Sequence, residues 1–307
     1  MSTSPRGVWF LDEKFTSTPN FDFKQLKTWR VFDSDRSFRV ATVIGLEGAD
    51  QATVLDRVLT VELASKQQIS QRSGKGVWLS ETRINDVLVM DVGPFGCGDL
   101  AANPMLVENS VALAIALSEV IIINYSDPIG NGQTATLCTA IAALNVTSLL
   151  DSGKKRRLIF FVSDHGDTAG ATDMRKEITT QLEKCWKKPN QKPGGPSLSD
   201  VYDISVLPFP CGHGHPERLD ECIEQLHAWF TKKDDSEYVF KDKYCGPVPP
   251  MKLVGSNSDP YIWEKIFDMC TSAQSTNTAP NHVGTVLSGN GVLYDNRVDQ
   301  TMYQPTH

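Results

Sequence analysis

The chain has 307 residues, of which 40% are hydrophobic and 22% charged, and its net charge at neutral pH is −7. This composition is typical of a soluble globular protein, and the acidic balance argues against a nucleic-acid-binding surface, which needs clustered lysine and arginine. The seven cysteines follow no paired pattern, which favours reduced thiols over disulfides. Residues Met1–Pro5 contain no apolar stretch, so we expect no signal segment, and no apolar run approaches the about 20 residues of a membrane helix. We therefore expect a cytoplasmic protein without a membrane span.

Apolar runs and helical patterns alternate along most of the chain. The strand-like runs are rich in Val, Ile, Leu and Phe without strict polar alternation, as in strands covered on both faces. Their alternation with helices predicts an α/β fold, a doubly wound and mainly parallel sheet with helices on both faces. Strands are predicted at 38–44, 87–92, 119–125, 157–163 and 203–207, and helices at 51–64, 105–118, 133–150, 172–187 and 216–232.

The remaining segments suggest how the chain is divided. Residues 189–199 contain three prolines and two glycines and are predicted to form a surface loop, whereas 260–269 form a short amphipathic helix. We expect an N-terminal extension (1–35) packed on a nucleotide-binding-like domain (36–250), then a packed C-terminal helix (251–270). The Ser-, Thr-, Asn- and Gly-rich stretch 271–307 is expected to be a poorly ordered tail.

The turn after the first central strand has the frame of a phosphate-binding loop without its chemistry. Such a loop reads G-x-x-x-x-G-K-[ST], and its lysine and hydroxyl bind phosphate and Mg²⁺. Here Gly45 opens the turn and Gly48 lies within it, but Asp50, Gln51 and Ala52 occupy the last three motif positions, and Thr53 follows. A carboxylate at Asp50 would repel a polyphosphate. The alternative is an ordinary glycine-containing turn between a strand and a helix.

Polar residues at the ends of later strands fit the same interpretation. Asp91, followed closely by Gly93, stands where a nucleotide triphosphatase places the carboxylate of its Mg²⁺ shell, although aspartate also commonly begins a turn. Ser163-Asp164 ends another strand, and Asp164 could accept two hydrogen bonds from guanine. The polar loop Arg72-Ser73-Gly74-Lys75 is a candidate switch segment.

With these motifs in this order, the chain resembles the G domain of the atlastin-related dynamin-like GTPases, in the root-hair-defective/Sey branch of the guanylate-binding-protein superfamily. The resemblance extends from about Trp9 to Ile266. It is carried by Phe10–Phe15, Gly74–Trp78, Val89–Val92, Ala112–Asn124, Phe160–His165, Leu182–Trp186, Pro196–Asp200, Val206–Pro208, Phe240–Tyr244 and Ile262–Ile266.

The resemblance implies binding of GTP and Mg²⁺, dimerisation through G domains and fusion of endoplasmic reticulum tubules. The pocket departs from the family pattern: Gln51 and Ala52 replace the lysine and the Mg²⁺-binding hydroxyl, Gly93-Pro94 replaces a Glu-Gly pair, and Ser163 replaces an arginine. The position of the family's Mg²⁺-binding switch threonine corresponds to about Gly74 in this chain. Asp91 and Asp164 are retained. The family's helical bundle and transmembrane hairpin are expected to be absent.

We therefore predict a degenerate GTP-binding domain with no catalytic residues and no required cofactor. It would act as a binding or scaffolding module for a protein partner, either itself or an active family member, in the cytoplasm and peripheral to the endoplasmic reticulum. The alternative is a divergent active GTPase that binds GTP with Mg²⁺, hydrolyses it to GDP, and holds the phosphates with Arg72 or Lys75.

One further cluster suggests a metal site. Cys211, His213 and His215 are close in sequence, but zinc sites usually draw ligands from two separated pairs. Because this loop follows Val206–Pro208, where the resemblance places a guanine-capping turn, we favour a turn over a metal site.

Overall fold

The computed structural model describes eleven parts of the chain. These are residues 7–11, 38–46, 53–61, 76–84, 86–95, 111, 117–125, 155–164, 170–187, 196–210 and 216–241. Of the calls on domain organisation, the packed helix at 251–270 and the tail at 271–307 lie outside the described residues, as do the helices predicted at 133–150 and 260–269.

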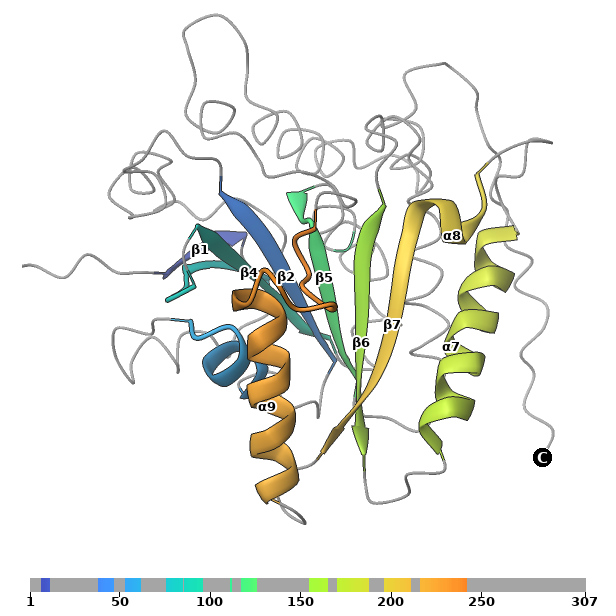
Figure 1. Ribbon diagram of the computed structural model, residues 1–307. Helices are drawn as coiled ribbons and strands as arrows, with labels where there is room; N and C mark the ends of the chain where they lie inside the picture. Colours follow the sequence, from blue (N-terminus) through green and yellow to red (C-terminus); the bar gives the residue numbers. More distant parts are fainter. Residues whose placement is uncertain are drawn as a thin grey trace, which may run out of the picture.

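The described elements form one seven-stranded sheet with helices on both faces (Figure 1). Its strand order is β1-β3-β4-β2-β5-β6-β7. Strands β4, β2, β5, β6 and β7 run parallel, whereas β3 is antiparallel to both β4 and β1. The predicted mainly parallel α/β fold is confirmed. The strands are β1 (Gly7–Leu11), β2 (Arg39–Leu46), β3 (Val77–Glu81), β4 (Val87–Phe95), β5 (Val120–Tyr125), β6 (Arg156–Asp164) and β7 (Tyr202–Pro210), and the helices are η2 (Val54–Val58), α7 (Gly170–Lys187), α8 (Leu198–Val201) and α9 (Pro216–Thr231).

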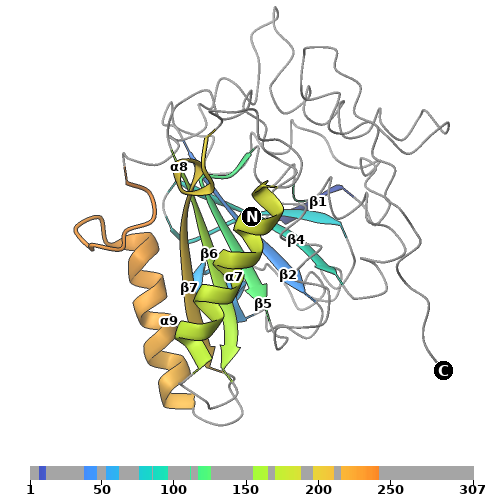
Figure 2. The same ribbon diagram turned by 90° about the vertical axis from the view of Figure 1, so that its right-hand side faces the viewer.

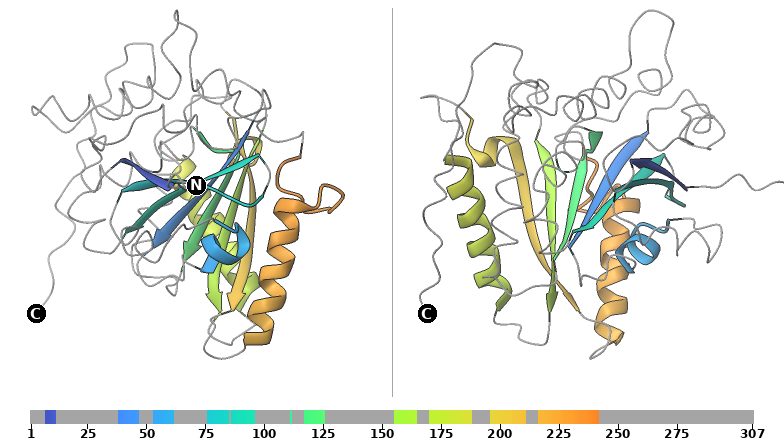
Figure 3. Two further views of the ribbon diagram at one scale, coloured as in Figure 1. Left: turned by 90° about the vertical axis from the view of Figure 1, so that its left-hand side faces the viewer. Right: turned by 180° about the vertical axis from the view of Figure 1, so that it is seen from behind.

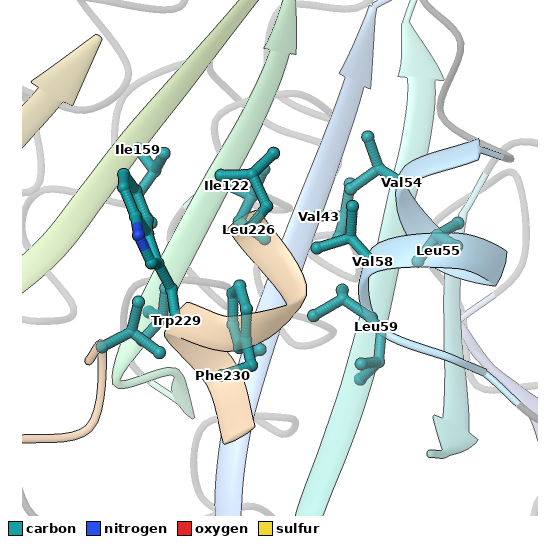
Figure 4. Close-up of a cluster of buried hydrophobic side chains, with 14 of the residues drawn as sticks. Val43, Val54, Leu55, Val58, Leu59, Ile122, Ile159, Leu226, Trp229 and Phe230 are labelled. Atoms are coloured by element: carbon teal, nitrogen blue, oxygen red, sulfur yellow. The ribbon is translucent and has the colours of Figure 1, made fainter. Parts of the chain in front are cut away.

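Helices η2 and α9 cover one face of the sheet. Apolar residues of α9 recur at helical spacing, so that one stripe faces the strands. Side chains such as Leu226 and Phe230 meet Val43 and Ile122 of the central strands and Val58 of η2 in one buried cluster (Figure 4). All five of these residues are at most 2% exposed. This cluster fixes α9 and η2 together on the sheet.

Helix α7 lies beside β7, on the side of the sheet opposite to α9 (Figure 3). Its Trp186 packs edge-on against Tyr202 at the start of β7, with ring centroids 6.1 Å apart, and Ile178 and Leu182 of the same helix are buried. Alternate residues of β6 and β7 point to opposite faces, and Phe161 and Phe209 stack at 5.4 Å on the α9 side. In the central strands β2 and β5, consecutive residues such as Val43 and Ile44 are buried, so these strands are covered on both faces.

After α9 the chain turns back across the sheet in a segment that we call the strap (Lys232–Lys241). The backbone of Val239 donates a hydrogen bond to the Trp229 carbonyl oxygen at 3.0 Å. The guanidinium carbon of Arg39 lies 5.0 Å from the centroid of the Phe240 ring, and Arg157 forms an ion pair with Glu237 at 2.5 Å. Both arginines lie at the starts of parallel strands. The strap is therefore attached to the side of the sheet where these strands begin, which we call the amino edge; the side where they end is the carboxyl edge.

A buried carboxyl group lies at the same edge. Glu119, which precedes β5, is 2% exposed and accepts a hydrogen bond from Arg39 at 2.9 Å. Arg156 lies nearby and donates to the carbonyl oxygen of Ser118. Burial raises the pKa of Glu119 from 4.5 to about 7, although Arg39 and Arg156 oppose this shift. Tyr238 of the strap faces Arg39 and Glu119, and its pKa is raised chiefly by burial.

Several boundaries differ from the sequence predictions, among them that of β7, which was predicted to end at 207 and continues to Pro210. The helix predicted at 51–64 is a single π-helical turn that ends at Val58, because Thr60 adopts a φ of 48° and Val61 leaves to bridge Thr82 of the neighbouring strand region. The loop predicted at 189–199 ends earlier, since Leu198 begins α8. Strand β4 continues beyond 92 to Phe95. Of the helix predicted at 105–118, the structure describes Val111 and Leu117 as helical and Ser118 as outside the helix.

Two strands were not predicted as elements of the sheet. β3 follows the candidate switch segment Arg72–Lys75, and β1 comes from the expected N-terminal extension. Both pair antiparallel at one side of the sheet. Their sequences give little signal, because β1 has only five residues and β3 is buried throughout.

The raised pKa of Glu119 predicts how stability depends on pH. Between about pH 4.5 and 7 the unfolded chain releases the Glu119 proton while the folded protein retains it, so the free energy of unfolding should fall as pH rises and level off above about 7. Denaturant titrations across this range will measure that slope. In Glu119→Gln the slope should become flatter; an identical slope in the variant would show that Glu119 does not carry this proton.

Candidate functional site

The predicted phosphate loop begins at the topological switch point of the sheet. From β2 the chain continues to β4 on one side and later to β5 on the other. In open α/β sheets, ligands bind outside the carboxyl ends of the strands at such a point. Gly45, the first residue of the loop motif, is buried and lies opposite Asn124 of β5. The fold therefore places this turn where a ligand site is expected.

Only the two ends of the loop are described. Gly45 lies near the end of β2, and Thr53 occupies the N-cap position of η2 without a capping side-chain hydrogen bond. Residues Gly48, Asp50, Gln51 and Ala52 lie outside the described part. Helix η2 is anchored through buried Val54, Leu55 and Val58, and His227 of α9 contacts the carbonyl oxygen of Val58 through Nδ1 at 2.8 Å. Both ends of the loop are thus held by the core.

The retained aspartate of β4 faces the same side of the sheet as η2. Asp91 is 7% exposed and lies opposite Val43 of β2 and Trp78 of β3. Val87 and Val89, two and four residues earlier, belong to the core cluster on the η2 face, so the alternation of the strand directs Asp91 to that face as well. Because β4 continues to Phe95, Asp91 lies within the strand and not at its end, which corrects the boundary inferred from the sequence.

Asn124 is a site residue that the sequence analysis did not single out. Its side chain is 1% exposed, and neither amide atom has a hydrogen-bond partner within the described residues. It lies between Gly45 of β2 and Phe161 of β6, with its side chain on the face of Ile122 and η2. Buried amides normally have partners. The available signal was the asparagine that follows the apolar run Val120–Ile123.

Gly93 has a backbone conformation that favours glycine. Its φ is 101°, and its N–H donates to the carbonyl oxygen of Gly76 at 3.1 Å, where Gly76 itself has a φ of 131°. L-residues rarely adopt such backbone angles. The family pattern implied by the resemblance has glutamate at position 93, which would be strained here. The Gly93-Pro94 sequence therefore accompanies a backbone geometry that suits glycine.

The predicted guanine-reading residues end β6. Ser163 and Asp164 lie opposite Phe209 and Pro210 of β7. They lie at the same edge as Gly45, because β2 and β6 are parallel, but β5 separates the two strands. The structure therefore brings Gly45, Asp91 and Asn124 together and places Ser163 and Asp164 further along the edge.

The remaining predicted site residues fall outside the described chain. These are the switch-like residues Arg72, Ser73, Gly74 and Lys75 and the metal candidates Cys211, His213 and His215. Within the residues that are described, no three His, Cys, Asp or Glu side chains are grouped as metal ligands. Nor does any helix of the described part have the length and apolar character needed to cross a bilayer.

The two edges of the sheet differ in charge. The amino ends of β2 and β6 carry Arg39, Arg156 and Arg157, whereas the described carboxyl-terminal residues of β2, β4, β5 and β6 include Asp91 and Asp164 but no lysine or arginine. Binding of a triphosphate requires cationic groups that balance its charge, and binding of its Mg²⁺ requires oxygen ligands. The described strand residues at this edge supply only the acidic part.

Comparison with protein families identifies the domain. Residues 44–269 match the model of the root hair defective 3 GTP-binding protein (RHD3) GTPase domain. The chain belongs to this family. The resemblance inferred from the sequence is confirmed, and this RHD3-type domain has the α/β fold of a G domain.

Individual relatives are distant and much longer. Protein SEY1 of Malassezia globosa is 25% identical over 286 residues, which cover 87% of this chain and 31% of that protein. Protein SEY1 of Cryptococcus neoformans var. neoformans serotype D is 24% identical over 240 residues, covering 73% and 29%. The chain thus spans about three tenths of the length of these curated relatives.

Solved structures show a weaker likeness. Translation elongation factor SelB from Methanococcus maripaludis, in its apo form, has a TM-score of 0.35 and 12% identity, covering 63% of this chain and 34% of that protein. A likeness at this level does not distinguish one function from another.

The backbone of Gly93 gives a direct test of this part of the site. Gly93→Ala should lower the free energy of unfolding by about 1–3 kcal/mol, because alanine is strained at a φ of 101°. Chemical denaturation will measure the change. Gly170→Ala in the first turn of α7 is the matched control and should be neutral or stabilising; equal losses in both variants would contradict a special geometry at Gly93.

Proposed function

We propose that this RHD3-type domain is a pseudo-GTPase that acts as a binding or scaffolding module. It keeps the fold and the framework of the nucleotide site, but it lacks the groups that hold and activate a triphosphate. Its partner would be a protein, either a second copy of this chain or an active member of the family.

The observation that carries the proposal is the composition of the phosphate loop. Gln51 and Ala52 stand in place of the lysine and the Mg²⁺-binding hydroxyl, and Asp50 adds a negative charge. A single arginine that stabilises the transition state of phosphoryl transfer can be worth about 10³–10⁵ in rate. The simultaneous loss of the lysine, the loop hydroxyl and the switch threonine is therefore expected to remove GTP hydrolysis.

The described geometry supports the same conclusion. The family implies GTP and Mg²⁺, and a carboxylate such as Asp91 could belong to an Mg²⁺ shell. Yet Asp91 is buried at an edge where the described residues of β2, β4, β5 and β6 offer no cation to balance phosphate charge. Removing Mg²⁺ and phosphate from water without such balance is unfavourable. The residues present fit Mg²⁺·GTP poorly.

The location and assembly that we propose follow from the family. The resemblance points to the cytoplasmic surface of the endoplasmic reticulum, where an emptied G domain could dock on an active relative. Since the chain covers about three tenths of the SEY1 proteins, we carry over the domain and not the activity of the whole relatives.

Restoring the loop should restore affinity. The triple variant Asp50→Gly, Gln51→Lys, Ala52→Ser should bind GTP with Mg²⁺ at least about tenfold more tightly than the wild type, because one charged hydrogen bond contributes about 1.5–3 kcal/mol. Isothermal titration calorimetry will measure binding, and phosphate release will measure turnover.

Two further variants separate the pseudo-GTPase from a divergent active enzyme. If Arg72 or Lys75 had replaced the missing lysine, the wild type would bind and hydrolyse GTP, and Arg72→Ala or Lys75→Ala would abolish this. Micromolar GTP binding with turnover in the wild type would refute the proposal.

A further inference from the structure

β7 forms one edge of the sheet and, in the described chain, pairs only with β6. The direction of its backbone groups follows from the register. The N–H of Arg157 donates to the carbonyl oxygen of Glu119, on the β5 side, at 3.2 Å, so odd-numbered residues of β6 bond toward β5 and even-numbered ones toward β7. Leu158 lies opposite Ile204. The even-numbered residues of β7 therefore direct their N–H and C=O groups away from the sheet.

This open edge is short and has defined limits. Ile204 and Val206 each present one N–H and one C=O outward, whereas Pro208 and Pro210, which share their parity, have no N–H. At the other end Asp203 supplies a charge of the kind that limits pairing at sheet edges. The stretch able to pair with a further strand is thus confined to residues 204–207.

A hollow of about 480 Å³ runs along this stretch. Residues 203–207 of β7 form its floor, Arg175 of α7 borders it, and Trp229 of α9 lines it together with Ser236 and Glu237 of the strap. Figure 2 looks onto this side of the sheet and shows α7 and α9 beside β7. The hollow therefore borders backbone donors and acceptors of β7 that no described strand uses.

We propose that residues Val283–Leu287 of this same chain, within the stretch 271–307 whose composition predicts poor order, become ordered by docking along β7 as an additional strand. The sequence Val-Gly-Thr-Val-Leu is rich in β-branched residues, uncharged and free of proline. The segment has five residues, which is long enough to pair along the four residues 204–207. Backbone hydrogen bonds to a sheet edge provide affinity in this mode of binding, and alternate side chains provide specificity.

The path of the chain supports an intramolecular strand. The strap, which lines the hollow through Ser236 and Glu237, is the last described part before the chain continues at residue 242. Residues 242–282 connect it to the proposed strand, and a connection of that length can reach any point on a domain of this size. The segment lies beyond residue 269, where the match to the family ends, so this strand would be specific to this chain.

Hydrogen exchange on the full chain tests the proposal. In the wild type, the amides of Ile204 and Val206 should exchange at least tenfold more slowly than in the double variant Thr285→Pro, Val286→Pro. Two adjacent prolines are used because only alternate N–H groups of the docked segment face β7. The matched control, Ser275→Pro with Thr276→Pro, should exchange like the wild type. Unchanged exchange at Ile122 and Ile159 will show that the sheet stays folded.

Three results would overturn the proposal. The first is equal exchange of Ile204 and Val206 in the wild type and the 285/286 variant. The second is exchange of the Thr285 and Val286 amides at the rate of an unstructured peptide in the wild type. The third is protection that persists in the variant and increases with protein concentration, which would identify a second copy as the occupant.

Discussion

Burial of the central strands on both faces is the constraint on which the rest of this domain depends. Helices η2 and α9 cover one face, and neighbouring residues that point to opposite faces, such as Val43 and Ile44 or Ile122 and Ile123, are all 0% exposed. Most of the charged side chains of the parallel strands consequently lie toward the two ends of these strands. These ends have opposite characters, with arginines at the amino edge and carboxylates at the carboxyl edge.

The amino edge shows what the arginines contribute. Arg39 pairs with Glu119 and lies over Phe240, and Arg157 pairs with Glu237 while lying 5.5 Å from the Trp229 ring. Each arginine thus joins a central strand to the segment that follows α9. These contacts need no nucleotide. A domain that loses its cations at the ligand edge can therefore keep those at the opposite edge and remain folded.

The contact between η2 and α9 extends this point. In addition to the shared apolar cluster, Arg57 pairs with Asp220 at 2.6 Å and His227 contacts the Val58 carbonyl oxygen. The Arg57–Asp220 pair is exposed, and pairs of this kind contribute little to stability; the buried side chains contribute most. The helix after the phosphate loop is thus held mainly by the packing of its apolar side chains against α9 and the sheet.

The sequence predicted the parallel strands and the long helices because their apolar runs are long and their patterns regular, as in 119–125 and 216–232. The predictions from the sequence were wrong where the local residue pattern and the contacts in the folded protein favour different structures. The helix after Gly45 was predicted to reach residue 64, but Thr60 turns and Val61 joins the edge of the sheet. Asn124 was not recognised because one polar residue after a buried run has many explanations until its neighbours in space are known. Gly45 was correctly placed near the end of its strand, and Asp91 lies on the adjacent strand β4 but within it and not at its end.

The pairing of β1 with β3 has a practical consequence. Gly7 lies so close to Trp78 that an added Cβ would be 2.6 Å from the indole nitrogen, which donates to Ser80 at 2.6 Å. The first described residues therefore shield a buried tryptophan and the backbone of an outer strand. A shortened protein that lacked β1 but kept β2 and the strands after it would lose this cover and would expose a bare strand to intermolecular association. Expression boundaries are better set ahead of Gly7.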